Sequence, residues 1–509
     1  MTFGLVLVTV TGLVTLHVVR PGSKYAWLAG MLGSLLVWLS VFLWQMEMGF
    51  TLSPGTWQPD TLFDGSPRWA IDPIGWLFAL SLTAMSAAII LSAPARLGPV
   101  SPMAWVGTIS MTTLGLLAVT AANPLTLLLT WAAIDFTEFF STLHSAQNAS
   151  ASERTVIAFG IRAFGTGLAM WALANGGMTA SFDAIQSQEA ALLLVAAGLR
   201  LGVLPLHLPH RTEPALRRGL GTAIRLTAAT SSLVLLARTS AAAASLPLTP
   251  LLVLVTLAAL YAGWKWLSVA DELTARPYWI IGMASLAVVA ALRGNATGSA
   301  ALGSTLVLFG SLSFLYSSRN PQMGRILALL ALGLGSLPFT LTATSWQGAE
   351  MFIGFWPFLL IAQTLLVVGY IRHILRASED VFAALPRWTQ ISYPAGLGIL
   401  ALTSIIGGLW GWPGALSLGN WGAALTVFLL SGIMIFILLR ITGVNIPSGP
   451  GEALTRLSIV QDAIARLLWG LYILAARIIN FIANLLEGDG GLLWTLLLLV
   501  VIFSLVQSQ

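Results

Sequence analysis

The sequence predicts an all-α protein that crosses a membrane about sixteen times. Over 509 residues it is 57% hydrophobic and only 8% charged, whereas a soluble domain carries roughly 25% charged residues. Apolar runs of about twenty residues, the length that spans a bilayer, recur along the whole chain. The basic residues also fall mostly on one side of the resulting topology. This composition excludes a soluble globular protein, a disordered protein and a nucleic-acid-binding protein.

Short stretches that contain Pro, Gly, Asn or Arg separate the apolar runs, and such stretches end helices. They divide the chain into sixteen candidate spans. The expected spans are 3–19, 26–46, 72–93, 101–120, 123–143, 155–175, 190–206, 216–238, 248–268, 277–293, 299–316, 324–343, 350–372, 390–412, 420–442 and 491–507.

The basic residues predict the orientation of these spans. If the chain crosses at every span, 18 Lys and Arg fall on the side of Arg20. Three, Arg68, Arg238 and Arg293, fall on the other side. Since Lys and Arg accumulate in cytoplasmic loops, the first side is expected to be cytoplasmic. The chain is then a multi-pass protein of the cell (cytoplasmic) membrane with both termini on the non-cytoplasmic side.

The segment 452–487 differs from the spans because its charges are regularly spaced. Glu452 and Arg456, and likewise Asp462 and Arg466, are four residues apart, so each pair shares a helical face. Apolar residues between them form a stripe at helical spacing. The pattern predicts a cytoplasmic amphipathic helix about 50 Å long. It either rests on lipid headgroups or braces neighbouring subunits, and one further span follows it.

The chain contains no cysteine. Disulfides, thiolate metal sites and iron–sulfur clusters are therefore excluded from it. The sequence also has no phosphate-binding loop and no soluble domain. We expect no cofactor and no metal site, so that any redox chemistry would occur on a partner. As an enzyme the chain would be at most a translocase subunit.

Five stretches of the sequence, taken in order and with their spacing, resemble the motifs of a known protein family. They are Ile71-Asp72-Pro73-Ile74-Gly75-Trp76-Leu77-Phe78, Asn123-Pro124-Leu125-Thr126-Leu127-Leu128-Leu129-Thr130-Trp131, Gly198-Leu199-Arg200-Leu201-Gly202-Val203-Leu204-Pro205-Leu206-His207, the pair Asp271 and Tyr278, and Gly335-Ser336-Leu337-Pro338. Together they resemble motifs of the antiporter-like membrane subunits of respiratory complex I, Mrp-type cation/proton antiporters and membrane-bound hydrogenases.

The resemblance implies two inverted five-helix repeats with broken helices, a recurrent transporter design. Here the first repeat would cover 101–238, with its break near Pro205, and the charge-poor second repeat 248–372. Transmembrane helices at 1–100 and 390–442 would flank them, followed by the lateral helix 452–487 and the final span 491–507. The expected partners are lipids and other membrane subunits of a larger complex, contacted partly through the lateral helix.

Ionisable residues inside the spans are the candidate functional residues, because a charge in a membrane is costly and marks a pathway or a buried pair. They all lie between positions 123 and 238, in the first repeat. The second repeat offers only neutral polar residues such as Ser345, Gln347 and Gln363. The six candidates are Asp135, Glu138, Arg162, Arg200, His207 and Arg225.

The resemblance implies a proton path through a Glu on the fifth span, a Lys on the seventh, a Lys or His on the eighth and a Lys or Glu on the twelfth. This chain departs from that set. The Glu position holds Ala132, with Asp135 three residues later on nearly the same face. The seventh-span Lys is replaced by Arg200. The eighth-span position is nearest to Arg225, and the twelfth-span position falls at about Ser345, which does not titrate.

These departures leave several interpretations open. Arginine stays protonated, so Arg200 cannot relay protons, although it can pin Asp135 or act as a fixed barrier to cations. Asp135 and Glu138 either belong to an ion path or form a structural network with Arg162 or Arg200. His207 either relays protons at the helix break or hydrogen-bonds the carbonyls that the break exposes.

The expected function is therefore proton or cation translocation through the first repeat, with the central relay modified or broken. One alternative is a non-conducting scaffold subunit of the same fold, and a variant of it is the membrane partner of an inorganic-carbon uptake complex. A third alternative is an unrelated transporter or lipid-modifying enzyme. That class usually places its catalytic residues on loops, and here only 47–71 and 372–389 carry several charges.

Overall fold

The computed structural model describes most of the chain from residue 1 to residue 440. It leaves out 21–24, 54–65, 96–100, 147–148, 175–180, 209–217, 244–248, 318–319, 349–353, 377–381 and 383–384. The described residues belong to one compact unit, Met1–Gly449. The expected lateral helix 452–487 and final span 491–507 lie outside the described residues.

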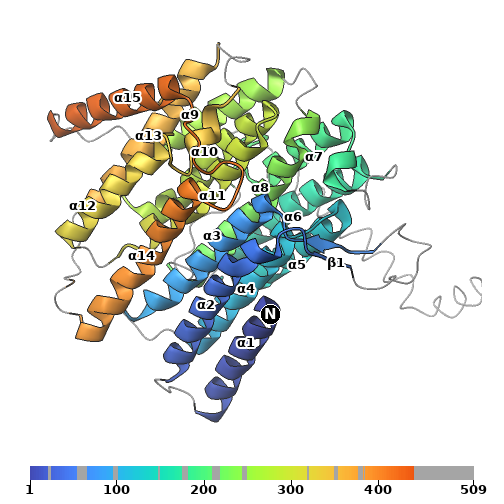
Figure 1. Ribbon diagram of the computed structural model, residues 1–509, viewed down its shortest axis with the longest axis vertical. Coiled ribbons are helices and arrows are strands. Elements are labelled where there is room, and N and C mark those ends of the chain that lie inside the picture. The colour runs from blue at the N-terminus through green and yellow to red at the C-terminus, as the bar shows by residue number, and fades with distance from the viewer. Residues whose placement is uncertain are drawn as a thin grey trace, which may run out of the picture. The chain divides into compact units, whose positions relative to one another are not determined.

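The described part of the chain is almost entirely helical (Figure 1), which confirms the predicted fold class. Two short strands, β1 (Thr51–Leu52) and β2 (Trp69–Ala70), pair antiparallel with Thr51 opposite Ala70. The α-helices are α1 (Thr2–Val19), α2 (Tyr25–Phe42), α3 (Pro73–Leu91), α4 (Pro102–Val119), α5 (Pro124–Ser145), α6 (Ala149–Ala172), α7 (Ser187–Arg200), α8 (Leu220–Ala243), α9 (Thr249–Ser268), α10 (Glu272–Leu292), α11 (Ala296–Leu315), α12 (Pro321–Leu330), α13 (Trp356–Leu375), α14 (Arg387–Leu409) and α15 (Trp421–Arg440). Short 3₁₀ helices are η1 (Leu43–Glu47), η2 (Ala93–Ala95), η3 (Phe182–Ala184), η4 (Ala331–Leu334) and η5 (Ala343–Trp346).

Length and apolar composition support a multi-pass membrane protein. Among the described residues, 11 helices are long and apolar enough to cross a membrane. Two shorter apolar helical segments cover Pro321–Leu334 and Trp421–Ile437. The expected spans 190–206 and 324–343 are helical only in part, because α7 ends at Arg200 and α12 ends at Leu330. The number of membrane crossings and the inverted repeats stay predictions.

The helix-breaking residues of the sequence serve as helix caps. Asp72, Asn123 and Asn320 each precede a proline that opens a helix, namely α3, α5 and α12. The Asp72 carboxylate accepts a hydrogen bond from the Gly75 backbone N–H at 3.0 Å. Proline suits the first helical position because its missing N–H would have no intrahelical partner there. The capping residue satisfies one of the remaining free N–H groups.

Burial separates central from peripheral helices. In α3, α10 and α11, between 94% and 100% of the apolar window is buried inside the protein, against 17% in α1 and 28% in α6. A helix that is apolar all round and buried all round lies at the centre of a bundle. Helices α8, α10, α3 and α14 all pack against α11. The core therefore forms around α11, while α1 and α6 keep broad exposed faces.

Arginine side chains tie helix termini together at both ends of this bundle. Arg238 of α8 pairs with Asp72 at 2.8 Å and donates to the Val119 carbonyl at 2.8 Å. At the opposite end of α8, Arg218 pairs with Glu272 at 2.6 Å and donates to the Phe314 carbonyl at 2.9 Å. Each arginine thus joins the terminus of α8 to those of two neighbouring helices.

Candidate functional site

Helix α5 carries two carboxylates toward the interior. Asp135 is 4% exposed and Glu138 is 2% exposed. Because the two residues are three positions apart, they lie on nearly the same face of the helix. A charge removed from water in this way is tolerated only with partners of opposite charge. Arginines from three other helices supply these partners.

Arg200, the last residue of α7, binds Asp135 through both ends of its guanidinium group. Its Nη1 donates to Oδ2 at 2.6 Å and its Nη2 donates to Oδ1 at 2.9 Å. Nη1 also donates to Thr166 Oγ1 at 2.8 Å, and Nε donates to Ser232 Oγ at 3.3 Å. The group lies over the Trp131 ring, 4.1 Å from its centroid. These contacts from α5, α6 and α8 fix the guanidinium in one orientation.

Glu138 is held by two further arginines. Arg162 of α6 donates from Nη2 to Glu138 Oε1 at 2.6 Å and from Nη1 to Oε2. Arg225 of α8 donates to Oε1 of the same carboxylate. Arg162 also lies 3.6 Å from Asp135. Asp135, Glu138, Arg162, Arg200 and Arg225 therefore form one continuous network, called the ion-pair cluster below, that joins α5, α6, α7 and α8.

Close packing of α6 against α7 positions the cluster. A Cβ atom built on Gly165 would lie 2.9 Å from Arg200 Cγ and 3.2 Å from the Ala196 carbonyl oxygen. Trp131 is fully buried and donates from Nε1 to the Ser231 carbonyl at 3.0 Å. Sequence reasoning named neither residue as part of the site. The only signals available were that Gly165 lies three positions after Arg162 and Trp131 one turn before Asp135.

His207 lies beyond the end of α7, where the chain turns. The backbone N–H of Val203 donates to the Gly198 carbonyl at 2.8 Å, and that of His207 donates to the Gly202 carbonyl at 3.0 Å. The His207 Nδ1 atom is 2.8 Å from the Pro205 carbonyl oxygen, while Nε2 is buried and has no hydrogen-bond partner among the described residues. Within that part of the chain no hydrogen bond or ion pair joins His207 to the ion-pair cluster.

A second turn, between η4 and η5, is closed by neutral groups. Ser345 Oγ lies 2.8 Å from Ser336 Oγ, and Gln363 Nε2 donates to Ser336 Oγ at 2.9 Å. The amide oxygen of Gln363 accepts from Trp346 Nε1 at 2.7 Å. The backbone of Ser336 is left-handed, with φ of 60°, and its N–H donates to the Thr342 hydroxyl at 3.1 Å. Side chains within this turn therefore contact one another through hydroxyl, amide and indole groups, whereas those beside α7 do so through charged groups.

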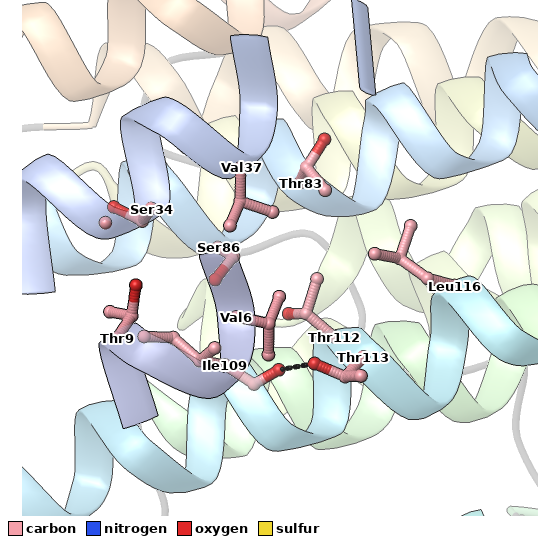
Figure 2. Close-up of a pocket in the computed structure, with 11 residues that line it drawn as sticks. Val6, Thr9, Ser34, Val37, Thr83, Ser86, Ile109, Thr112, Thr113 and Leu116 are labelled. Atoms are coloured by element: carbon pink, nitrogen blue, oxygen red, sulfur yellow. Dashed lines mark hydrogen bonds between the residues drawn. The ribbon is translucent and has the colours of Figure 1, made fainter. Parts of the chain in front are cut away.

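A small pocket between α1, α2, α3 and α4 is a different kind of feature (Figure 2). Most of its hydroxyl groups bond to carbonyls of their own helices, as where Thr113 Oγ1 donates to the Ile109 carbonyl at 2.8 Å. None of its lining residues is ionisable, so the pocket offers no group for ion transfer. The lining residues are Val6, Thr9, Gly33, Ser34, Val37, Thr83, Ser86, Ile109, Thr112, Thr113 and Leu116. The described residues also contain no cluster of three or more His, Asp or Glu that could hold a metal ion.

Comparison with known proteins identifies the fold. No family model and no curated protein sequence matches the chain. Among solved structures, a chain of the Mrp complex from Dietzia sp. DQ12-45-1b matches with a TM-score of 0.67 and 15% identity. That match covers 100% of this chain but only 63% of the Mrp chain, so this protein spans less than two thirds of its length.

Two further structures match over most of this chain. A chain of the membrane-bound sulfane sulfur reductase, an archaeal respiratory membrane complex, matches with a TM-score of 0.62 and 14% identity, over 98% of this chain and 99% of that chain. A chain of respiratory complex I from Thermus thermophilus matches with a TM-score of 0.59 and 18% identity, over 82% and 100%. The protein therefore has the fold of the antiporter-like membrane subunits, as its sequence motifs predict.

Proposed function

We propose that this protein is an antiporter-like subunit of a multisubunit membrane complex and that its own helix bundle is a non-conducting scaffold. The observation that carries this proposal is the pairing in the ion-pair cluster. Asp135 is held at both oxygens by Arg200, and Glu138 is held by Arg162 and Arg225. A guanidinium keeps its proton at every physiological pH, so a proton relay that needs a release at these positions stops there.

The second turn supports the same proposal. A relay that leaves the first repeat needs another titratable group to receive the proton. Ser345, Ser336 and Gln363 provide hydroxyl and amide groups instead, and these are already hydrogen-bonded to one another. The two turns thus combine a fixed charge with a neutral network. Neither the ion-pair cluster nor this neutral network supplies a group that gains and loses a proton near neutral pH, and His207 belongs to neither of them.

The similar structures support an assembly with other subunits, because each of the three is a complex: Mrp, a respiratory membrane complex and respiratory complex I. We propose that this chain contacts its membrane partners partly through 452–487. We further propose that it crosses the cytoplasmic membrane sixteen times, as two inverted repeats at 101–238 and 248–372 with flanking helices, and that both termini are non-cytoplasmic. That the protein acts as one subunit of such an assembly belongs to the same proposal.

The test is ion flux through the assembled complex. The complex is purified through a tag on this chain, its subunits are identified, and it is reconstituted in liposomes containing a pH-sensitive dye. Asp135→Asn is expected to leave the proton flux per assembled complex unchanged. Asp183→Asn, the same substitution at an exposed position, is the matched control. Loss of most of the flux in Asp135→Asn, with assembly intact, would overturn the scaffold proposal.

One observation favours translocation as the second candidate function. His207 is 7% exposed, and its Nε2 atom has no partner in the described part of the chain. A buried imidazole with one free nitrogen is the kind of group that accepts and releases protons. If His207→Gln and Asp135→Asn both abolish flux while the complex stays assembled, the first repeat conducts. If only assembly or stability changes, the scaffold proposal stands.

A further inference from the structure

Arg293 is a buried cation with no carboxylate partner among the described residues. It follows the last residue of α10 and is 8% exposed. Its Nη2 donates to the Ser345 carbonyl at 2.6 Å, and its guanidinium carbon lies 5.2 Å from the Trp346 ring centroid. No ion pair involves Arg293 among the described residues, unlike the three arginines of the ion-pair cluster.

The turn that holds Arg293 also begins the next helix. Gly294 has a left-handed φ of 73°, and the Asn295 N–H donates to the Ala290 carbonyl at 2.9 Å, which closes α10. Asn295 then caps α11 by accepting from the Gly298 N–H at 2.7 Å. The N-terminal end of a helix carries a partial positive charge. The start of α11 therefore adds to the positive potential near Arg293, and the C-terminal end of α10 offers only a partial negative charge, so the two helix ends do not supply a full counter-charge.

Three buried polar groups in this region have no hydrogen-bond partner in the described part of the chain: Arg293 Nε, Ser299 Oγ and Thr344 Oγ1. Arg293 follows α10, Ser299 lies in the first turn of α11, and Thr344 belongs to η5, which packs against both helices. Asn295 Nδ2 donates to the Thr344 carbonyl at 2.7 Å, and Arg293 binds the carbonyl of the next residue. A Cβ on Gly298, beside Ser299, would lie 2.9 Å from the Thr344 carbonyl oxygen.

The chemistry of these groups selects the ligand. A guanidinium N–H only donates hydrogen bonds, and both hydroxyls can donate. A water molecule would satisfy the hydroxyls but leave the buried charge uncompensated, which is costly. An anion beside Arg293 Nε would accept its hydrogen bond and neutralise the charge. Ser299 and Thr344 are 0% and 2% exposed, so the group that fits is small. We propose that the α10–α11 turn and η5 form a binding site for a small monovalent inorganic anion of the chloride type.

Thermal unfolding of the full chain in detergent tests this proposal. Chloride is exchanged for gluconate at constant ionic strength, so that only the identity of the anion changes. Chloride is expected to raise the unfolding midpoint of the wild type in a saturable manner, because a ligand that binds only the folded state stabilises it. Arg293→Met is expected to abolish the response. Arg68→Met removes an exposed arginine expected on the same side of the membrane and should leave the response unchanged.

A second measurement uses the wild-type protein and so tests the proposal even if Arg293→Met does not fold. Anomalous diffraction from wild-type crystals grown in bromide is expected to place a peak beside Arg293 Nε. The proposal is overturned if the wild type does not respond to chloride, if Arg293→Met keeps the response, or if no bromide peak lies at the turn. Glu350, which is outside the described residues, offers a carboxylate as the rival counter-charge. A chloride response seen only in Glu350→Gln would assign the counter-charge to that carboxylate and would also overturn the proposal.

Discussion

The pair between Asp135 and Arg200 yields the most direct quantitative prediction. The guanidinium makes two charge-assisted hydrogen bonds to the carboxylate, at 2.6 and 2.9 Å. Each such bond contributes about 1.5–3 kcal/mol, so the pair as a whole contributes about 3–6 kcal/mol. Breaking a buried pair by removing one partner costs about 3–5 kcal/mol, which agrees with that sum. We therefore expect Asp135→Asn and Arg200→Met each to lower the free energy of unfolding by about 3 kcal/mol.

The double variant isolates the interaction energy between Asp135 and Arg200 from the effect of removing each residue alone. Because the double variant removes both members of the pair, neither Asp135 nor Arg200 is left without the other, so Asp135→Asn with Arg200→Met should be less destabilised than the sum of the single variants. The expected coupling energy is about 3 kcal/mol, measured as equilibrium unfolding in mixed detergent micelles. Arg376→Met is a matched control. The Arg376 side chain is 47% exposed and 3.8 Å from Glu272, so its removal should cost less than about 1 kcal/mol.

A small coupling energy would refute this reasoning. If it were below about 1 kcal/mol, Asp135 and Arg200 would behave like an exposed pair in a high-dielectric medium. The centre of the first repeat would then be hydrated, and the argument that the arginines lock the carboxylates in place would fail. The same measurement therefore also bears on the proposed scaffold function.

Three further predictions follow from local geometry and are measured by the same unfolding assay. Gly165→Ala pushes a methyl group into the arginine that ends α7 and should destabilise the protein, whereas Gly167, which has no neighbour within 4 Å, should tolerate the same change. Gly33→Ala drives its Cβ into the side chain of Thr9 of α1 and should cost about 1–3 kcal/mol. Gly30→Ala on the same helix, with ordinary contacts from 3.6 Å, should cost little. Burial raises the pKa of Asp271, but hydrogen bonds from the first turn of α10 and nearby arginines outweigh this and hold it below its usual value. The ionised Asp271 carboxylate stabilises the folded state above its unfolded pKa, about 3.9, and this stabilisation is lost as the pH falls through the pKa of the folded state. Asp271→Ala should therefore lower the free energy of unfolding by about 1 kcal/mol at pH 7, and that free energy should vary less with pH in the acid range.

The sequence predicted the helices well because the physical signals for them are local. An apolar run of membrane length, preceded by a capping residue and a proline, fixes where a helix begins without knowledge of its neighbours. Asp72 with Pro73 and Asn123 with Pro124 begin α3 and α5 as the pattern indicates. The concentration of ionisable residues between 123 and 238 likewise identified the bundle in which the ion-pair cluster lies.

The partners within the cluster could not be predicted in the same way. Helical spacing places Asp135 and Glu138 on one face, but it does not say which arginine meets which carboxylate. That choice depends on how α6, α7 and α8 are rotated, and Arg200 is 65 positions from Asp135. Arg293 shows the same limit of local reasoning. As a residue between two spans it is expected near the surface, yet it is buried because η5 folds back against the α10–α11 turn.

The location of the ion-pair cluster has a structural explanation that does not require transport. In a membrane, helices gain little from burying apolar side chains against one another, because lipid is equally apolar, so association depends on close packing and polar contacts. Helices α10 and α11 are buried over 94% and 100% of their apolar windows, so close packing holds them along almost their whole length. Helix α6 is buried over only 28% of its window and needs another source of attachment. Arg162 provides it by binding both carboxylates of α5, so the costly charges hold this weakly packed helix in place.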